Sequence, residues 1–136
     1  MKVIVAKTAG FCWGVKRAMD AVLEASAQSG SHKVQTLGPL IHNPQALALI
    51  ENRGVSVVTE PEHVQGGTVV IRAHGIPIQS LRGLKERQNR GELNIVNATC
   101  PEVAKVHNKI KKWREEIFRN ITKKFSTISN KIETSS

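Results

Sequence analysis

The sequence predicts an α/β fold of three layers, in which helices flank a mostly parallel sheet. Two observations favour this class. Short apolar segments alternate along the chain with amphipathic segments of helical period, and Gly or Pro stands at many of the junctions between them. Strands that alternate with helices at this spacing form βαβ units, whose strands run parallel. The chain has 136 residues, which suits one domain, and shows no internal repeat.

The elements follow one another in a regular order. The expected strands are short apolar runs, at 2–6, 34–37, 55–58, 68–71 and 94–96. The expected helices lie between them, at 15–27, 45–52 and 77–88, with a long terminal helix after the last strand. Gly30 and Gly54 end the first two helices, whereas Pro44 and Pro101 stand where a proline can start one. A turn at 61–67 separates the third and fourth strands.

The net charge of +9 is concentrated in the last quarter of the chain. Residues 1–103 carry 11 Lys or Arg against 8 Asp or Glu, whereas residues 104–136 carry 9 against 3. A nucleic-acid surface spreads its basic residues over the fold and adds aromatic side chains for stacking, but this chain has no Tyr and few other aromatic residues. The composition therefore argues against nucleic acid as a partner.

No apolar run approaches the roughly 20 residues that span a bilayer. Lys7 interrupts the N-terminal apolar run, which makes that run a poor signal peptide. We therefore expect a cytoplasmic protein that does not contact a membrane. In that reducing compartment two cysteines act more often as ligands, nucleophiles or buried thiols than as a disulfide.

The two cysteines and two of the histidines share a position in the predicted fold, because each follows an expected strand. They are Cys12, His42, His74 and Cys100. In an open α/β sheet the loops that leave the carboxyl ends of the strands share one edge, and ligands bind there. We therefore expect these four side chains to line one cleft.

Each of these residues also has a plainer interpretation. Cysteine is among the most buried residue types, and a single histidine is more often structural than catalytic. Against this, Cys12 lies between Gly10 and Gly14, and both cysteines stand where a helix begins, where free N–H groups and the helix dipole favour negative charge. Imidazolium groups in the same cleft suit an anion such as phosphate. A zinc site and a Cys–His hydrolase or transferase are further options, although the usual spacing of zinc ligands and a nucleophile motif are both missing.

Four motifs together resemble one enzyme family. They read AGFCWGVKRA at 9–18, GPLIHN at 38–43, VIRAHG at 70–75 and ATCP at 98–101, the last followed by Val103, Lys105, Val106 and His107. In this order and spacing they are similar to 4-hydroxy-3-methylbut-2-enyl diphosphate reductase, the last enzyme of the non-mevalonate isoprenoid pathway. The resemblance covers about residues 1–112.

The resemblance implies an iron–sulfur enzyme that removes an allylic hydroxyl by two-electron reduction and forms isopentenyl and dimethylallyl diphosphate. Members of the family have three similar α/β domains, each of which gives one cysteine to a central 4Fe-4S cluster. By this resemblance Cys12 and Cys100 match two of the metal ligands, and His42 and His74 match histidines that hold the substrate. Ferredoxin or flavodoxin would be the electron donor.

Departures from the family pattern limit what the resemblance implies. The chain has no third cysteine and no His-Pro-Glu segment, whose glutamate supplies the proton in the family, so no catalytic residue is assigned. Asn97 stands where the family usually has aspartate. We interpret residues 1–112 as the N-terminal α/β domain of such a reductase and residues 113–136 as a divergent basic tail, helical or disordered, from a truncated, frameshifted or interrupted gene.

This interpretation leaves two functional classes open. As an enzyme, the chain would need a missing part, such as a complementing fragment supplied in trans, and we expect little turnover and poor cluster binding from this chain alone. The alternative is an inactive stranded domain or a non-enzymatic binding module with a basic amphipathic tail.

The tail predicts an amphipathic helix that runs into the 120s. Its apolar residues recur at steps of three or four, at Val106, Ile110, Trp113, Ile117, Ile121, Phe125, Ile128 and Ile132. Such a stripe is expected to fold back on the core, to pair with another copy or to remain exposed. The alternative is disorder, because 7 of the 18 residues at 119–136 are Ser or Thr, which form helices poorly.

Overall fold

The structure is a computed structural model that describes residues 1–7 and 9–133, and the side chains of the last helix as far as Lys124. The chain forms two compact units, Met1–Val103 and Ala104–Ser136. The sheet lies in the first unit. The terminal helix, α4 (Pro101–Glu133), starts at the predicted proline and continues through the described part of the second unit.

Four parallel strands form the sheet, in the order β2-β1-β3-β4. Their bounds agree with the prediction, and only the last two are slightly longer than expected: β1 (Val34–Leu37), β2 (Val55–Val58), β3 (Gly67–Ile71) and β4 (Leu93–Asn97). The interior strand β1 is buried along its whole length. A parallel sheet needs cover on both faces, and this one has it.

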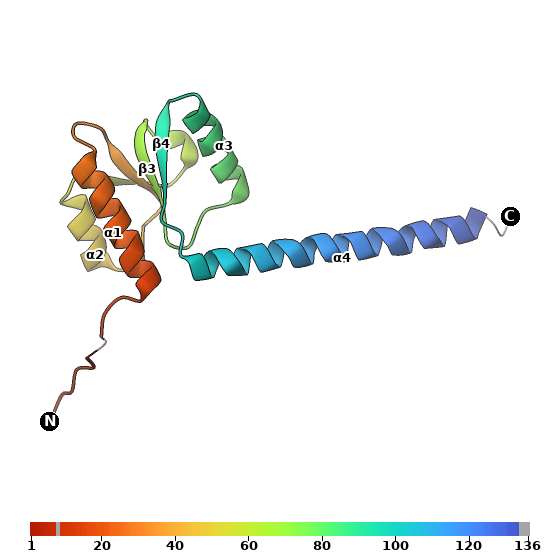
Figure 1. Ribbon diagram of the computed structural model, residues 1–136, viewed down its shortest axis with the longest axis horizontal. Helices are drawn as coiled ribbons and strands as arrows, with labels where there is room; N and C mark the ends of the chain where they lie inside the picture. The colour runs from red at the N-terminus through yellow and green to blue at the C-terminus, as the bar shows by residue number, and fades with distance from the viewer. Residues whose placement is uncertain (8, 134–136) are drawn as a thin grey trace. The chain divides into compact units, whose positions relative to one another are not determined.

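Three helices supply that cover: α1 (Trp13–Gln28), α2 (Pro44–Glu51) and α3 (Ile78–Asn89). Figure 1 shows α1 and α2 on one side of the sheet and α3 on the other. A short 3-10 helix, η1 (Pro61–His63), lies in the predicted turn between β2 and β3. The predicted α/β fold with a parallel sheet and flanking helices is confirmed.

Each face of the sheet has its own apolar core. Ala18 and Val22 of α1 pack with Val70 of β3 in the larger cluster, whereas Leu84 of α3 packs with Val69 in the smaller one. Val69 and Val70 are neighbours in the sequence but belong to opposite clusters, because successive side chains of a strand point to opposite faces. Burying one such side chain contributes about 1.5–3 kcal/mol, so both faces contribute to the stability of the unit.

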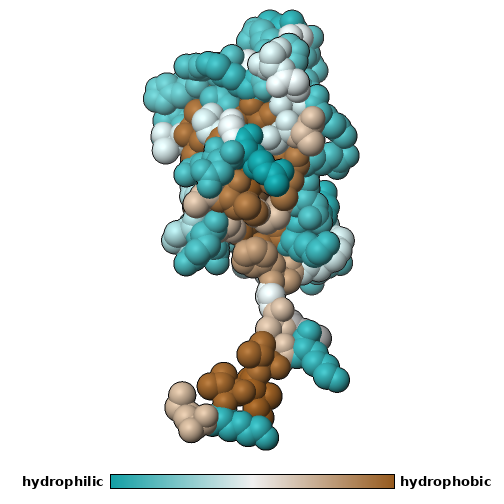
Figure 2. All heavy atoms as spheres, turned by 90° about the vertical axis from the view of Figure 1, so that its left-hand side faces the viewer, coloured by the Kyte–Doolittle hydropathy of each residue, from teal (hydrophilic) through white to brown (hydrophobic). Residues whose placement is uncertain are grey.

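The predicted strand at 2–6 is wrong. The segment forms no strand, and the side chains of Val3, Ile4 and Val5 are 73, 81 and 76% exposed. Figure 2 shows this apolar N-terminal segment standing apart from the body of the unit. A strand persists only where a neighbouring strand takes up its backbone N–H and C=O groups, and residues 1–7 form no ladder with the sheet. The composition of the segment is that of a strand, but composition does not identify a pairing partner.

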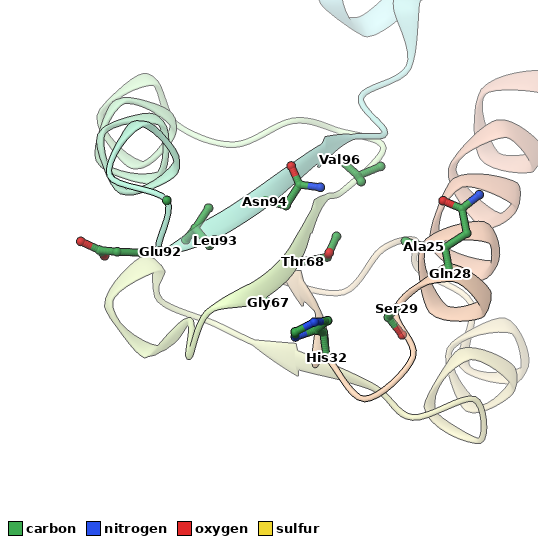
Figure 3. Close-up of a pocket in the computed structure, with 11 residues that line it drawn as sticks. Ala25, Gln28, Ser29, His32, Gly67, Thr68, Glu92, Leu93, Asn94 and Val96 are labelled. Carbon is green, nitrogen blue, oxygen red and sulfur yellow. The ribbon is translucent and has the colours of Figure 1, made fainter.

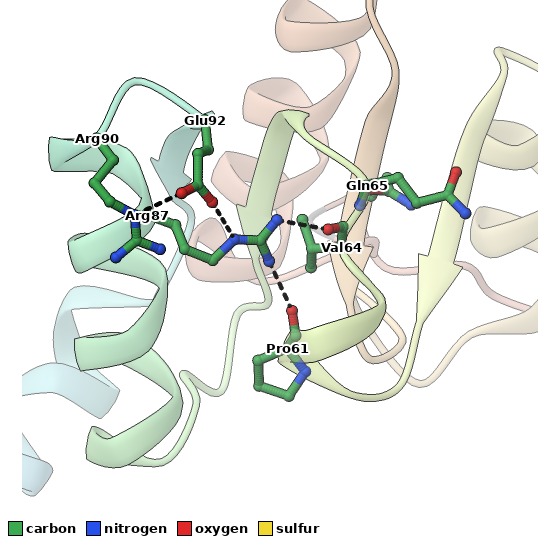
Figure 4. Close-up of polar contacts among 7 residues, drawn as sticks. Pro61, Val64, Gln65, Arg87, Arg90 and Glu92 are labelled. Carbon is green, nitrogen blue, oxygen red and sulfur yellow. Dashed lines mark hydrogen bonds and ion pairs between the residues drawn. The ribbon is translucent and has the colours of Figure 1, made fainter.

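Arg87 of α3 ties the connection between β2 and β3 to the start of β4 (Figure 4). Its guanidinium donates to the carbonyl oxygens of Pro61 at 3.2 Å and Val64 at 2.8 Å, and its Nε lies 3.0 Å from the carboxylate of Glu92. Arg90 bonds the other oxygen of Glu92. These hydrogen bonds, that of Arg90 first and that of Arg87 second, hold the pKa of Glu92 below its ordinary value of 4.5. Because the folded pKa is lowered, this carboxylate stabilises the fold at neutral pH, and its contribution is lost as the pH falls through that lowered value.

Replacing Arg87 with methionine is expected to destabilise the first unit by about 1–3 kcal/mol, because two half-buried carbonyl oxygens lose a charged donor. Arg82→Met is the matched control, since Arg82 is exposed on the same helix. Urea unfolding at neutral pH measures both variants. The Arg87 variant should also lose less stability than the wild type on acidification, because Glu92 keeps only one of its two cations. Equal unfolding midpoints for the two variants would contradict this role.

Candidate functional site

The loops after β1 and β3 leave the sheet at its topological switch point. The next strand after β1, β2, lies on one side of β1, and β3 lies on the other side, so the strand order reverses between β1 and β3. Open α/β sheets bind their ligands at the carboxyl ends of the strands where the order reverses in this way. The parallel ladder continues beyond the strands, because the N–H of Ala73 donates to Leu40 O at 3.3 Å and that of Ala98 to Ile71 O at 3.1 Å. The N–H of Cys100 donates to Ala73 O at 2.9 Å. Three of the predicted site segments are therefore fixed side by side.

His42 and His74 face each other across the switch point. Their ring centroids lie 5.2 Å apart and the ring planes are inclined by 37°. His42 stands directly before the N-cap of α2, Asn43, whose side-chain oxygen accepts a hydrogen bond from the N–H of Ala46 at 2.9 Å. Both histidines are exposed, so two neighbouring imidazoles from separate loops are accessible to solvent.

Cys12 and Cys100 both lie at the first turn of α1. Cys12 is the N-cap of this helix, with extended backbone and an exposed thiol. Gly14, in the first turn, is buried against the thiol of Cys100, because a Cβ built on Gly14 would lie 2.5 Å from the Sγ atom of Cys100. The missing side chain of Gly14 therefore makes the room in which the second thiol sits, on the same helical turn that Cys12 begins.

Arg17 fixes the loop that carries Cys100 to α1. Its guanidinium donates to the carbonyl oxygens of Thr99 at 3.0 Å and Asn97 at 3.4 Å. The side-chain oxygen of Asn97 accepts a hydrogen bond from the N–H of Thr99 at 3.0 Å. The neutral carboxamide of Asn97 therefore stabilises this turn by accepting a hydrogen bond. The carboxylate oxygen of an aspartate could accept the same bond.

Arg72 lies between the two loops that carry the histidines. Its Nε donates to the carbonyl oxygen of Gly75 at 3.0 Å, next to His74. Its Nη1 lies 2.8 Å from the point that a Cβ on Gly38 would occupy, at the start of the loop that leads to His42. The sequence pattern indicates no role for Arg17 or Arg72, although both stand inside the four motifs. Their acceptors are backbone carbonyl oxygens, which no residue pattern reveals.

A hollow of about 550 Å³ lies elsewhere, at the opposite edge of the sheet where β3 and β4 begin. Figure 3 shows its lining from α1, β3 and β4, with His32 among neutral side chains and the carboxylate of Glu92 pointing away from them. Glu92 is held by Arg87 and Arg90. Because this hollow presents neither a cysteine nor a pair of histidines, size alone does not make it the functional site.

The comparisons with known proteins agree with the four motifs. A family model described as LytB protein matches residues 3–122. The chain belongs to the LytB family. Among its curated relatives, the 4-hydroxy-3-methylbut-2-enyl diphosphate reductase of Geobacter sulfurreducens is 42% identical over 112 residues, which are 82% of this chain and 38% of that protein. The enzyme of the same name from Aquifex aeolicus is 43% identical over 108 residues, or 79% of this chain and 36% of that protein.

Solved structures give the same result. A structure of (E)-4-hydroxy-3-methyl-but-2-enyl diphosphate reductase, described as the terminal enzyme of the non-mevalonate pathway, superposes with a TM-score of 0.67 at 40% identity, over 84% of this chain and 39% of that one. The Plasmodium falciparum reductase superposes with a TM-score of 0.68 at 28% identity, over 81% of this chain and 33% of that one. This LytB-family chain thus spans well under half the length of the relatives it matches. Among its described residues, no helix is both long and apolar enough to cross a membrane.

Proposed function

We propose that this chain supplies the first α/β unit of a 4-hydroxy-3-methylbut-2-enyl diphosphate reductase. In this role Cys12 and Cys100 provide two thiolate ligands to a 4Fe-4S cluster, and His42 and His74 bind the diphosphate of the substrate. The observation that carries the proposal is the contact between Gly14 and the thiol of Cys100, on the helical turn that Cys12 caps. Family membership and the printed names of the relatives supply the reaction.

The residues present fit part of a cluster site. Two thiols at one helix N-terminus suit an anionic iron–sulfur group, because the first N–H groups of α1 carry partial positive charge toward it. The described residues contain no group of three or more His, Cys, Asp and Glu side chains arranged to hold a metal ion. The sequence has only two cysteines, so a third thiolate would come from a further part of the family's protein or from a fragment in trans. When bound, the cluster supplies electrons and an iron site that can take the substrate hydroxyl.

The other residues of the site bind and position the substrate. Two imidazoles whose centroids are 5.2 Å apart can each donate an N–H to diphosphate oxygens, and protonation of either ring strengthens that bond. Arg72 braces the His74 loop through its bond to Gly75 and lies beside Gly38 at the start of the His42 loop, and Arg17 holds the Cys100 loop against α1. These two arginines are positioning residues, since their donors are engaged with backbone oxygens. Ferredoxin or flavodoxin remains the proposed electron donor.

Anaerobic reconstitution with iron and sulfide tests this proposal on the 136-residue chain. We expect iron well below one cluster per chain and only weak visible charge-transfer absorbance, because two thiolates leave the cluster under-ligated. Cys12→Ser and Cys100→Ser should each lower the bound iron further, and the double variant should abolish it.

An added small thiol should raise the iron content of the wild type but not that of the double variant. Unchanged iron in the double variant would refute the ligand assignment. A stable, stoichiometric cluster with turnover would refute the need for a ligand from outside the chain.

A further inference from the structure

Helix α4 carries an apolar stripe on one side. Val106, Ile110, Trp113 and Ile117 are between 54 and 61% exposed, and they follow one another at steps of four, three and four residues. This alternation places apolar side chains at the a and d positions of a heptad, with Ile110 and Ile117 at a and Val106 and Trp113 at d. The stripe therefore has the pattern of a coiled-coil seam rather than that of scattered surface residues.

The charges beside the seam distinguish the two ways of pairing such helices. The g positions hold Lys109 and Glu116, and the e positions hold His107 and Arg114. In a parallel pair a g residue lies beside the e residue of the next heptad in the other helix, which would place Lys109 against Arg114. In an antiparallel pair g lies beside g, so Lys109 meets Glu116 twice across the twofold axis. The e positions then bring His107 beside Arg114, so this register places no Lys or Arg against another.

The apolar residues select the same register independently of the charges. The antiparallel register that joins the two g positions also aligns Ile110 with Trp113 of the other helix and Val106 with Ile117. Each of these contacts occurs twice, so all four central layers of the seam are apolar on both sides. An isologous interface requires a surface that complements itself, and here both the apolar and the charged patterns do so in one register.

We propose that α4 pairs with α4 of a second copy of this chain as an antiparallel two-stranded coiled coil. The self-complementary charge pattern is what identifies a second copy as the occupant of the stripe. The seam covers about two heptads, fewer than the three or four of a sustained coiled coil, so we expect a weak, reversible dimer that forms only at high protein concentration. The proposal does not depend on the cluster or on the substrate.

Sedimentation equilibrium of the 136-residue chain under reducing conditions tests the proposal. The wild type should shift from monomer to dimer as its concentration rises into the hundreds of micromolar. Glu116→Lys should weaken the dimer roughly tenfold, because it places two lysines together at both ends of the twofold contact. The double variant with Lys109→Glu and Glu116→Lys should restore the wild-type dissociation constant, since the pair is merely reversed.

Glu115→Lys is the matched control, because it makes the same charge change at the f position, away from the seam, and should leave association unchanged. Lys109→Glu alone separates the two orientations: it should weaken an antiparallel dimer, whereas it would relieve repulsion and tighten a parallel one. Circular dichroism of every variant checks that α4 remains helical. A wild type that stays monomeric at all concentrations would overturn the proposal, as would equal effects of the substitutions at Glu115 and Glu116, or a tighter dimer with Lys109→Glu.

Discussion

Replacing Gly67 with alanine is expected to destabilise the first unit by about 2–5 kcal/mol, the largest effect on stability that we predict for one methyl group. Gly67 begins β3 with a φ of +71°, a left-handed conformation in which the Cβ of an L-residue comes too close to a backbone carbonyl oxygen. A Cβ there would also lie 2.3 Å from the carbonyl oxygen of Lys33 and 3.1 Å from its nitrogen. These are backbone atoms, which cannot rotate away. The same oxygen accepts the hydrogen bond from Thr68 at 2.8 Å that starts the pairing of β3 with β1, so the strain falls on the centre of the sheet.

Gly91→Ala separates the two causes of this effect. Gly91 has nearly the same φ, +74°, but a Cβ there meets no atom within 4 Å. This substitution should therefore lower the free energy of unfolding by about 1–2 kcal/mol, the cost of the left-handed backbone conformation alone. Urea unfolding of both variants, followed by circular dichroism, gives the difference. If the two variants lose equal stability, the contact between Gly67 and Lys33 does not constrain the sheet.

The contrast between these two glycines shows how far the sequence could predict the fold. The strands of the sheet are apolar runs with turn residues at their ends, and local pattern was enough to place them. The close approach of Gly67 to Lys33 depends on which strands pair, which local pattern does not contain. Strand pairing also explains why the predicted strand at 2–6 is wrong, because its residues have the composition of a strand but no neighbour in the sheet.

The candidate site likewise contains residues that the sequence predicts and contacts that it does not. The rule that ligands bind at the carboxyl ends of parallel strands selected the cysteines and histidines as a set, and the structure pairs His42 with His74 and seats Cys100 against the turn that Cys12 caps. Their roles as cluster and substrate ligands remain predictions. The supporting contacts of Arg17 and Arg72 could not be predicted from the sequence, because their acceptors are backbone carbonyl oxygens that the fold brings near.

Replacing Gly14 with alanine is expected to disturb the candidate cluster site directly. Alanine in a helix normally stabilises a protein by about 0.5–1 kcal/mol relative to glycine. At Gly14 this gain should be reversed to a loss of about 1–3 kcal/mol, because the new methyl group would overlap the Sγ atom of Cys100 and crowd its Cβ at 3.1 Å. The displaced thiol should also lower the iron that the chain retains after reconstitution with an added thiol.

Gly83→Ala is the control for this substitution, since Gly83 lies on α3 and an added Cβ there would meet no atom within 4 Å, so the variant should show the ordinary gain in stability without a change in iron. Combining Gly14→Ala with Cys100→Ala removes the overlapping sulfur. It should therefore recover part of the lost stability, while the bound iron stays as low as in Cys100→Ala alone. Recovery of stability without recovery of iron separates packing from ligation, because packing needs only the space around the sulfur, whereas ligation needs the sulfur itself. A Gly14 variant as stable and as rich in iron as the Gly83 variant would mean that the thiol of Cys100 does not need the turn of α1 to hold its place.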